Sequence, residues 1–243
     1  MSIEIKPESV VVMAAGDVRQ LIAAIRGASD GSDRANIALI YAKASMLHVH
    51  AFFSLLGEDA AAPLSLTSGV HLRTAVELHL RSLWAGFSLS EEVLWHHLLN
   101  DSGAGGFEKL LRALEEAAAR PELGPAERNT LQTTISIVGP LVGESWSVLC
   151  SHTHGGTRAF LASYNSFKQR PPLEHRDLLV MSLLGVRLAA HTGVFVSQVL
   201  SDQTGYDTAA NVLVTWTNFA KNFPLEAWRL ERVELQLGTR AHS

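Results

Sequence analysis

The stretch that decides the fold is LLVMSLLGVRLAAHTGVFVSQVL, which runs from Leu178 to Leu200. It is long and apolar enough to raise the question of a membrane span, but Arg187 falls at its middle. A charge at mid-bilayer costs about 2.5–3.5 kcal/mol even on the mildest scale. His191 and Gln198 add further polar groups. We therefore interpret it as the central helix of a soluble bundle, covering about 173–202, and expect no membrane partner.

The composition of the whole chain agrees with a helical fold. The chain has 243 residues, of which 47% are hydrophobic, and three of them are Tyr. Leu, Ala and Val dominate, which favours helix over strand. No internal repeat, low-complexity tract or clean alternating strand occurs. The sequence predicts an all-α fold, a single domain over 1–243 with about eight to ten helices and a flexible tail at about 238–243.

Turn-forming residues divide the chain into these helices. Ser32 or Asp33 is expected to cap the second helix, and Asp207 the last major one. Shorter helices are expected to open at 90–92 and to cover 156–166 and 224–237. The main helices are predicted at 7–28, 33–56, 66–87, 107–120, 126–138, 141–154, 173–202 and 207–223.

Charge and cysteine content limit the function classes. The formal net charge is −4 and the basic residues are scattered, which argues against sequence-independent binding of duplex nucleic acid. The charge distribution still allows a local cationic pocket that binds one phosphate or one RNA segment. The single cysteine rules out an internal disulfide, and the start MSIEIKPESV lacks a secretory-signal pattern. We expect a cytoplasmic protein.

The helix over 66–87 carries the first candidate site. Arg73, Glu77 and Arg81 form a polar stripe in which Glu77 lies four residues from both arginines and can pair with either. In one interpretation Arg73 binds an anion or phosphate and Glu77 orients it. In the other, the ion pair ties this helix to its neighbours. The apolar face of the same helix is formed by Leu72, Val76, His79 and Leu83.

The second candidate site is the segment CSHTHGG at 150–156. Ser151, His152 and His154 stand where the helix over 141–154 is expected to stop, before two glycines. A histidine beside an Arg–Glu pair can act as a general acid or base near neutral pH. The alternative is that the histidines cap the last carbonyls of the helix. We expect Arg73, Glu77 and His152 to approach one another.

The histidine spacing does not predict a metal site. Eleven histidines are present, but no H-x-x-x-H, H-E-x-x-H or E-x-x-H pattern occurs. His96 and His97 are adjacent, and His48 and His50 are two residues apart, so each pair diverges on a helix. Cys150 follows an apolar pair and is interpreted as a buried, inert thiol. We expect no metal and no cofactor.

The two candidate-site motifs resemble those of a known group of proteins. The helix HLRTAVELHLRSLW at 71–84, followed by SHTHGG at 151–156, resembles an uncharacterised family of all-helical bacterial proteins, whose broad layout is similar to that of the HEPN and abortive-infection superfamily, over roughly residues 30–200. The resemblance implies a metal-independent ribonuclease that acts as a dimer and uses an Arg and a His separated by four to six residues. Arg170 and His175 match that spacing, although two prolines follow Arg170 where the family has a polar residue.

The resulting hypothesis is a HEPN-like, nucleic-acid-processing or defence-associated protein, with RNA or a protein as partner and a homodimer as assembly. Its catalytic residues are predicted to be Arg73, Glu77, His152 and His154, with Arg170 and His175 as the alternative. The competing hypothesis is a non-catalytic helical module that binds a protein or small ligand. A helical hydrolase with an unrecognised metal is a third hypothesis.

Overall fold

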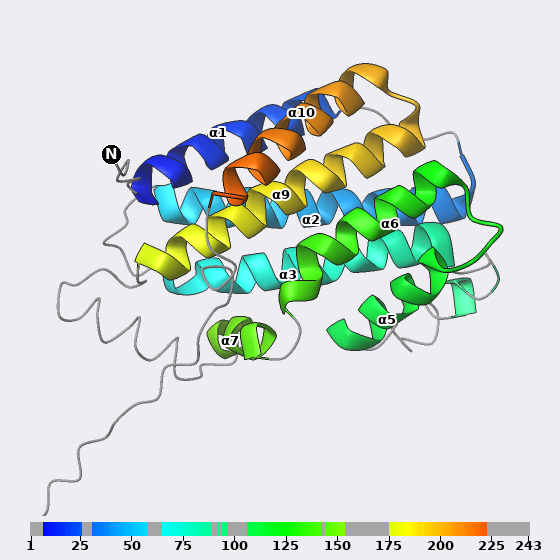
Figure 1. The fold of residues 1–243 in the computed structure, drawn as a ribbon, viewed down its shortest axis with the longest axis horizontal. Coiled ribbons are helices and arrows are strands. Elements are labelled where there is room, and N and C mark those ends of the chain that lie inside the picture. Colours follow the sequence, from blue (N-terminus) through cyan, green and yellow to red (C-terminus); the bar gives the residue numbers. More distant parts are fainter. Residues whose placement is uncertain are drawn as a thin grey trace, which may run out of the picture.

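A computed structural model of the chain describes residues 7–25, 31–57, 65–88, 92, 94–96, 106–141, 144–153 and 175–222. The described part is helical and contains no strand, which confirms the all-α fold (Figure 1). The predicted helices over 156–166 and 224–237 and the tail at 238–243 lie outside the described residues. The elements are α1 (Pro7–Ala24), α2 (Asp33–Gly57), α3 (Ser65–Leu83), the π-helical turn η1 (Trp84–Ser88), α5 (Phe107–Ala118), α6 (Pro125–Val138), the 3-10 turn η2 (Gly139–Leu141), α7 (Glu144–Thr153), α9 (His175–Leu200) and α10 (Gln203–Ala220).

Helix α9 lies at the centre of the bundle. It contacts α1, α2, α3, α6 and α10, which surround it in Figure 1. By length and composition alone, both α2 and α9 are candidate membrane spans, with 44% and 89% of their apolar windows buried inside the protein. The apolar sequence of α9 is thus accounted for by burial against other helices.

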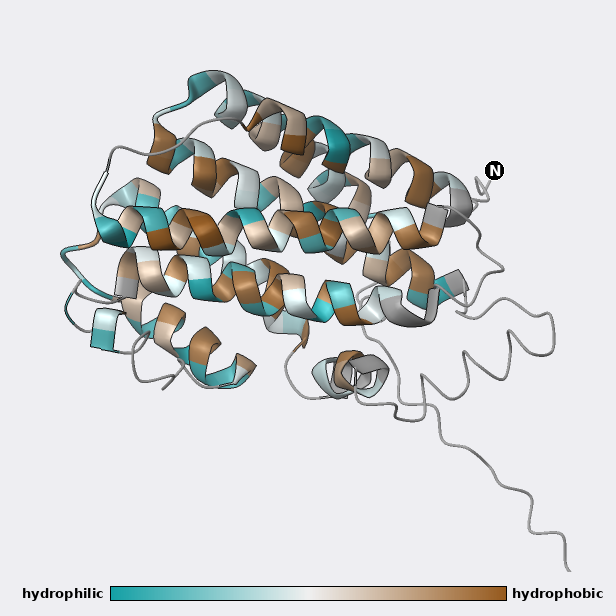
Figure 2. Ribbon diagram, turned by 180° about the vertical axis from the view of Figure 1, so that it is seen from behind, coloured by the Kyte–Doolittle hydropathy of each residue, from teal (hydrophilic) through white to brown (hydrophobic). Residues whose placement is uncertain are grey.

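The most extensive helix–helix contact joins α2 and α3. Within it, the buried hydroxyl of Ser45 donates a hydrogen bond to the Ala75 carbonyl at 2.8 Å. On the other side of α9, the indole Nε1 of Trp216 in α10 donates to Asp17 Oδ2 in α1 at 2.6 Å. Figure 2 shows apolar residues along the helices throughout the described bundle.

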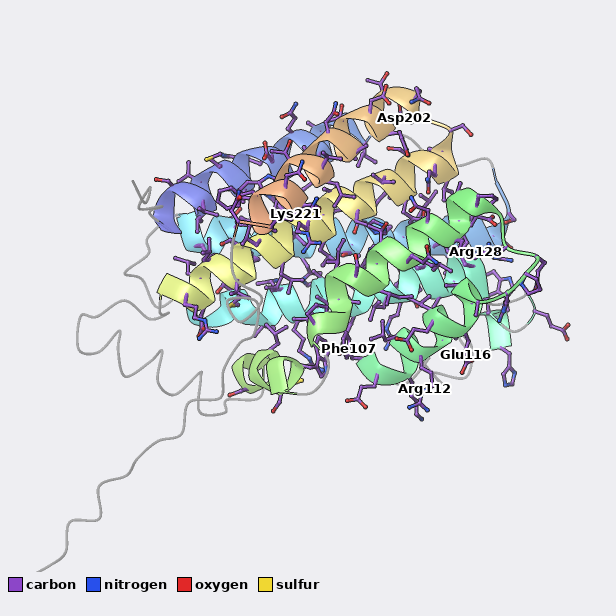
Figure 3. All side chains as sticks on the ribbon, viewed as in Figure 1. Phe107, Arg112, Glu116, Arg128, Asp202 and Lys221 are labelled. Atoms are coloured by element: carbon purple, nitrogen blue, oxygen red, sulfur yellow. The ribbon has the colours of Figure 1, made fainter. Side chains whose placement is uncertain are left out.

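Helix α5 covers the far side of α3. Phe107, Leu110 and Leu114 are buried, and they recur at helical spacing along one face. Arg112 and Glu116 extend from the opposite, exposed face in Figure 3. The helix is therefore a surface element, and its buried face turns towards α3, α6 and η1.

The helix caps are partly as predicted. Ser32 caps α2, since its Oγ accepts a hydrogen bond from the Ala35 amide at 3.3 Å. The prediction that Asp207 caps the last major helix is wrong. The cap of α10 is Asp202, whose Oδ1 accepts from the Gly205 amide at 3.0 Å. The chain reverses at Ser201, which has a φ of 53°, so α10 begins directly after α9 ends.

Two helical glycines provide a matched test of the packing around α9. A Cβ at Gly193 would lie 3.0 Å from both Ala209 Cβ and Ile25 Cδ1, whereas a Cβ at Gly16 would meet nothing within 4 Å. We expect Gly16→Ala to raise the free energy of unfolding by about 0.5–1 kcal/mol through helix propensity. Gly193→Ala should lower it by about 1–2 kcal/mol through overpacking. Urea unfolding measures both changes, and equal stabilisation by the two variants would contradict the close packing of α9.

Candidate functional site

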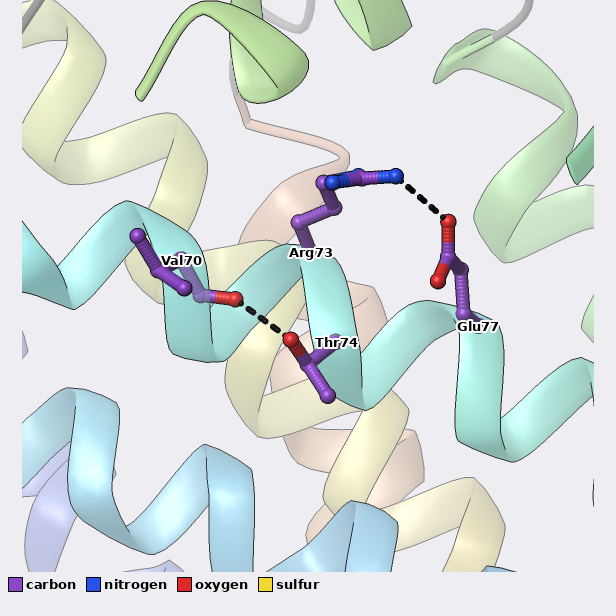
Figure 4. Close-up of polar contacts among 4 residues, drawn as sticks. All are labelled: Val70, Arg73, Thr74 and Glu77. Atoms are coloured by element: carbon purple, nitrogen blue, oxygen red, sulfur yellow. Dashed lines mark hydrogen bonds and ion pairs between the residues drawn. The ribbon is translucent and has the colours of Figure 1, made fainter. Parts of the chain in front are cut away.

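Arg73 and Glu77 form an ion pair on α3. The Nη2 atom of Arg73 donates to Glu77 Oε1 at 3.0 Å, as Figure 4 shows. The two side chains are 20% and 27% exposed, so the pair lies at the edge of the bundle rather than in its core. Of the two pairings that the sequence leaves open for Glu77, the structure contains the one with Arg73.

An aromatic ring lies beside Arg73, and a second ring stacks on the first. Its guanidinium carbon lies 5.7 Å from the ring centre of Trp146 in α7, within the range of a cation–π interaction. Trp146 in turn stacks on Phe107 of α5, with ring centres 4.1 Å apart and planes 16° apart. We call Arg73, Trp146 and Phe107 the arginine–tryptophan stack. It joins α3, α5 and α7, and it holds the arginine in one place.

Helix α7 brings part of the histidine motif to the same region. It packs against α3 and includes Ser151 and His152 in its last turn. The side chain of His152 and the whole of His154 lie outside the described residues. The predicted approach of His152 to Arg73 and Glu77 therefore stays a prediction, although the helices that carry them are in contact.

The remaining predicted residues are placed as follows. Arg170 lies outside the described residues, and His175 begins α9 with its side chain outside them. The alternative pair Arg170 and His175 stays a prediction. Cys150 is half-buried rather than fully buried, and its neighbour Leu149 is the residue that faces the core.

Sequence reasoning missed a polar cluster in the centre of the bundle. It consists of His79 from α3, Thr134 from α6, and His191 and Thr192 from α9; we call it the core histidine cluster. His79 Nε2 and His191 Nδ1 are 3.2 Å apart. Thr134 Oγ1 lies 3.3 Å from the former atom and 3.2 Å from the latter. The available signal was a histidine on the apolar face of α3 and another within the apolar run of α9.

The hydrogen bonds fix one tautomer in this cluster. The Thr192 hydroxyl donates to the Leu188 carbonyl at 2.7 Å, so its oxygen accepts from His79 Nδ1 at 2.9 Å. His79 then carries its proton on Nδ1 and presents a lone pair on Nε2 towards His191. The Nε2 atom of His191 has no hydrogen-bond partner among the described residues.

Both imidazoles in the cluster are held neutral. Burial lowers the pKa of His79 well below 6.5, and His191 lowers it further. Burial lowers the pKa of His191 to about 4; a contact with the Thr130 backbone opposes this shift, and Arg187 adds to it. The two side chains are 0% and 1% exposed. Because no substrate reaches atoms so deeply buried, we assign the cluster a structural role, fixing how α3, α6 and α9 pack.

The cluster makes stability depend on pH. Its histidines have pKa values below 6.5 in the folded state, so the unfolded chain binds more protons between pH 6.5 and about 4. Their contribution is complete above pH 6.5 and is lost as the pH falls, by up to about 1.4 kcal/mol per pH unit for each histidine. Urea unfolding from about pH 7 to pH 5 measures this slope.

A matched pair of variants checks the assignment. His191→Gln should reduce the pH slope, whereas His96→Gln, at an exposed position, should leave it unchanged. A stability that stays flat over this pH range in the wild-type protein would contradict the presence of two neutral, buried imidazoles.

Comparisons with known proteins complete the description of the site. No family model, curated protein or solved structure matches the chain.

Proposed function

We propose that the protein processes RNA as a metal-independent endoribonuclease of the HEPN kind, with its site where α3 meets α7. One observation carries the proposal: the ion pair of Arg73 and Glu77 stands on the part of α3 against which α7 packs. The last turn of α7 carries Ser151 and His152. The contact between Arg73 and Trp146 brings the helix that carries these residues to the ion pair, which supports the proposal.

The chemistry assigned to these residues needs no metal. Arg73 binds the scissile phosphate through its planar fork, and Glu77 orients the guanidinium. One histidine, His152 or His154, takes the proton of the ribose 2′-hydroxyl, whose oxygen then attacks phosphorus. The bond to the 5′-oxygen breaks, and the other histidine protonates that leaving oxygen. The products are a 2′,3′-cyclic phosphate and a 5′-hydroxyl.

The resemblance supports two further parts of the proposal. HEPN proteins act as dimers, so a second copy of this chain would bring a second Arg73 towards the same RNA. We also propose a soluble, cytoplasmic protein, and the 89% burial of the apolar window of α9 supports the first of these two properties.

One observation favours the competing function, a non-catalytic helical module. The guanidinium of Arg73 already contacts Glu77 and Trp146, and the Trp146 ring is stacked on Phe107. An arginine held in this way can serve to join three helices without meeting a ligand. The experiment below separates the two functions.

The test is cleavage of structured and single-stranded RNA by the purified protein, with and without EDTA. We expect cleavage that EDTA does not change and that falls by about 10²–10⁴-fold in His152→Ala or His154→Ala. Arg73→Ala should lose a similar factor, and Glu77→Gln should lose less. Arg81→Ala changes a half-buried arginine on the same helix and is the control that keeps activity.

Other outcomes decide against this assignment. Absence of cleavage on every RNA, together with unfolding of Arg73→Ala, points to the helical module. Loss of cleavage in EDTA points to a metal-dependent hydrolase. Loss in His175→Ala but not in His152→Ala moves the catalytic site to Arg170 and His175.

A further inference from the structure

One side of α2 presents a row of apolar side chains to solvent. Ile40 and Leu47 in this row are 66% and 58% exposed. Lys43 lies at the edge of the row rather than within it, because of its angular position on the helix. We call the row the α2 stripe. Its members fall within about 80° of the helix circumference and are Ile37, Ile40, Ala44, Leu47, Ala51 and Leu55.

The α2 stripe is unusual for the surface of a soluble protein. A surface helix normally places charged and polar residues on the side that faces away from the core. Helix α2 is apolar enough to be a candidate membrane span, yet 44% of its apolar window is buried inside the protein, against 89% for α9. Burial against other helices therefore accounts for the apolar sequence of α9, but it leaves about half of that of α2 without an explanation.

Helix α3 extends this apolar surface on one side. The two helices pack antiparallel and form the front layer in Figure 2. Thr74 and Leu78 are half-buried in α3. The hydroxyl of Thr74 donates to the Val70 carbonyl of its own helix at 2.9 Å, as Figure 4 shows. Because this polar atom already has a partner, Thr74 can be covered by another apolar surface at little cost.

The spacing within the α2 stripe fits a second helix. From Ile37 to Ala51 its members are separated alternately by three and four residues. This is the interval at which the side chains of one helix pack between those of another in a coiled coil. A lipid surface requires apolar area but no such interval. The stripe therefore favours a helical protein partner over a membrane.

The size of the surface indicates that both helices take part. From residue 37 to residue 55, α2 is roughly 27 Å long and about 10–12 Å wide, so the stripe alone offers roughly 300 Å². Two such stripes bury about 600 Å², which is less than the approximately 1,000 Å² of a specific interface. With α3 about 8–10 Å away, the surface is roughly 20 Å wide, and two copies bury roughly 1,100 Å².

We propose that the protein forms a two-fold symmetric homodimer in which the α2 stripe, together with Thr74 and Leu78, packs against the same surface of a second copy. A two-fold interface uses one patch twice, so the patch must be compatible with itself. The α2 stripe meets this condition, because none of its members is charged and no like charges face each other.

This inference specifies the surface of the dimer that belongs to the proposed function. It is drawn without the residues of the proposed ribonuclease site, since Figure 4 shows Arg73 and Thr74 on different sides of α3. Dimerisation is measured without RNA, so the two proposals can fail separately. A monomer that cleaves RNA would refute this surface and leave the ribonuclease in place, and a dimer that does not cleave RNA would do the reverse.

The experiment is analytical ultracentrifugation of the full chain over about 1–200 μM, where an interface of this size should show an equilibrium of monomer and dimer. Leu47→Glu should raise the dissociation constant more than tenfold, because it places two carboxylates in an apolar interface. Ile40→Glu should have the same effect. Val214→Glu is the matched control, because this apolar position on α10 is also 58% exposed and should leave the dissociation constant unchanged.

Thermal unfolding gives a second measurement that also reports whether each variant folds. The unfolding temperature of the wild-type protein should rise with protein concentration, because the dimer stabilises the folded state by mass action. That of a folded Leu47→Glu or Ile40→Glu variant should rise much less.

Three results overturn the proposal. The first is a wild-type protein that stays monomeric over the whole concentration range. The second is a dissociation constant that is unchanged in both Leu47→Glu and Ile40→Glu. The third is binding to vesicles of anionic phospholipid that Leu47→Glu abolishes and Val214→Glu retains, which assigns the α2 stripe to a membrane surface.

Discussion

Helix α9 is enclosed by other helices, and its burial determines how the neighbouring helices pack against it. Of its apolar window, 89% is buried inside the protein. A helix with almost no solvent face cannot leave polar side chains to water, because an unpartnered buried polar group costs about 1–3 kcal/mol. Thr192 meets this requirement within the core by donating to Leu188 and accepting from His79. His191 likewise meets His79 of α3 and Thr134 of α6, so the enclosure also fixes how these two helices lie against α9.

The depth of burial distinguishes the polar groups that a substrate can reach from those that it cannot. The core histidine cluster is sealed, and its imidazoles are neutral because charging them would place a positive charge in a dry interior. Arg73 and Glu77 remain partly exposed at the edge of the bundle. The deep cluster therefore contributes specificity of packing, while Arg73 at the edge is where the proposed function places a substrate phosphate.

The sequence predicted what depends on local spacing. The central helix followed from the apolar run at 178–200, and the pairing of Arg73 with Glu77 was one of two that the four-residue interval allowed. Contacts between distant segments were missed. His79 and His191 are separated by 112 positions, and no pattern within either helix shows that they face each other. The cap at Asp202 was missed because Gly205 and Asp207 resemble a turn, although Ser201 makes the reversal.

Three polar residues of α3, namely His71, Arg73 and His79, point in different directions. With about 100° between successive residues, His71 and Arg73 point to opposite sides, and His79 is offset from His71 by about 80°. Each direction meets a different neighbour: His71 meets α2, Arg73 meets α7, and His79 meets α6 and α9. The neighbour sets how deeply each side chain is buried: His71 is half-buried beside His48, whereas His79 is fully buried between α6 and α9. One amphipathic helix thus carries both a buried structural histidine and a partly exposed ion pair, because these positions are buried to different extents.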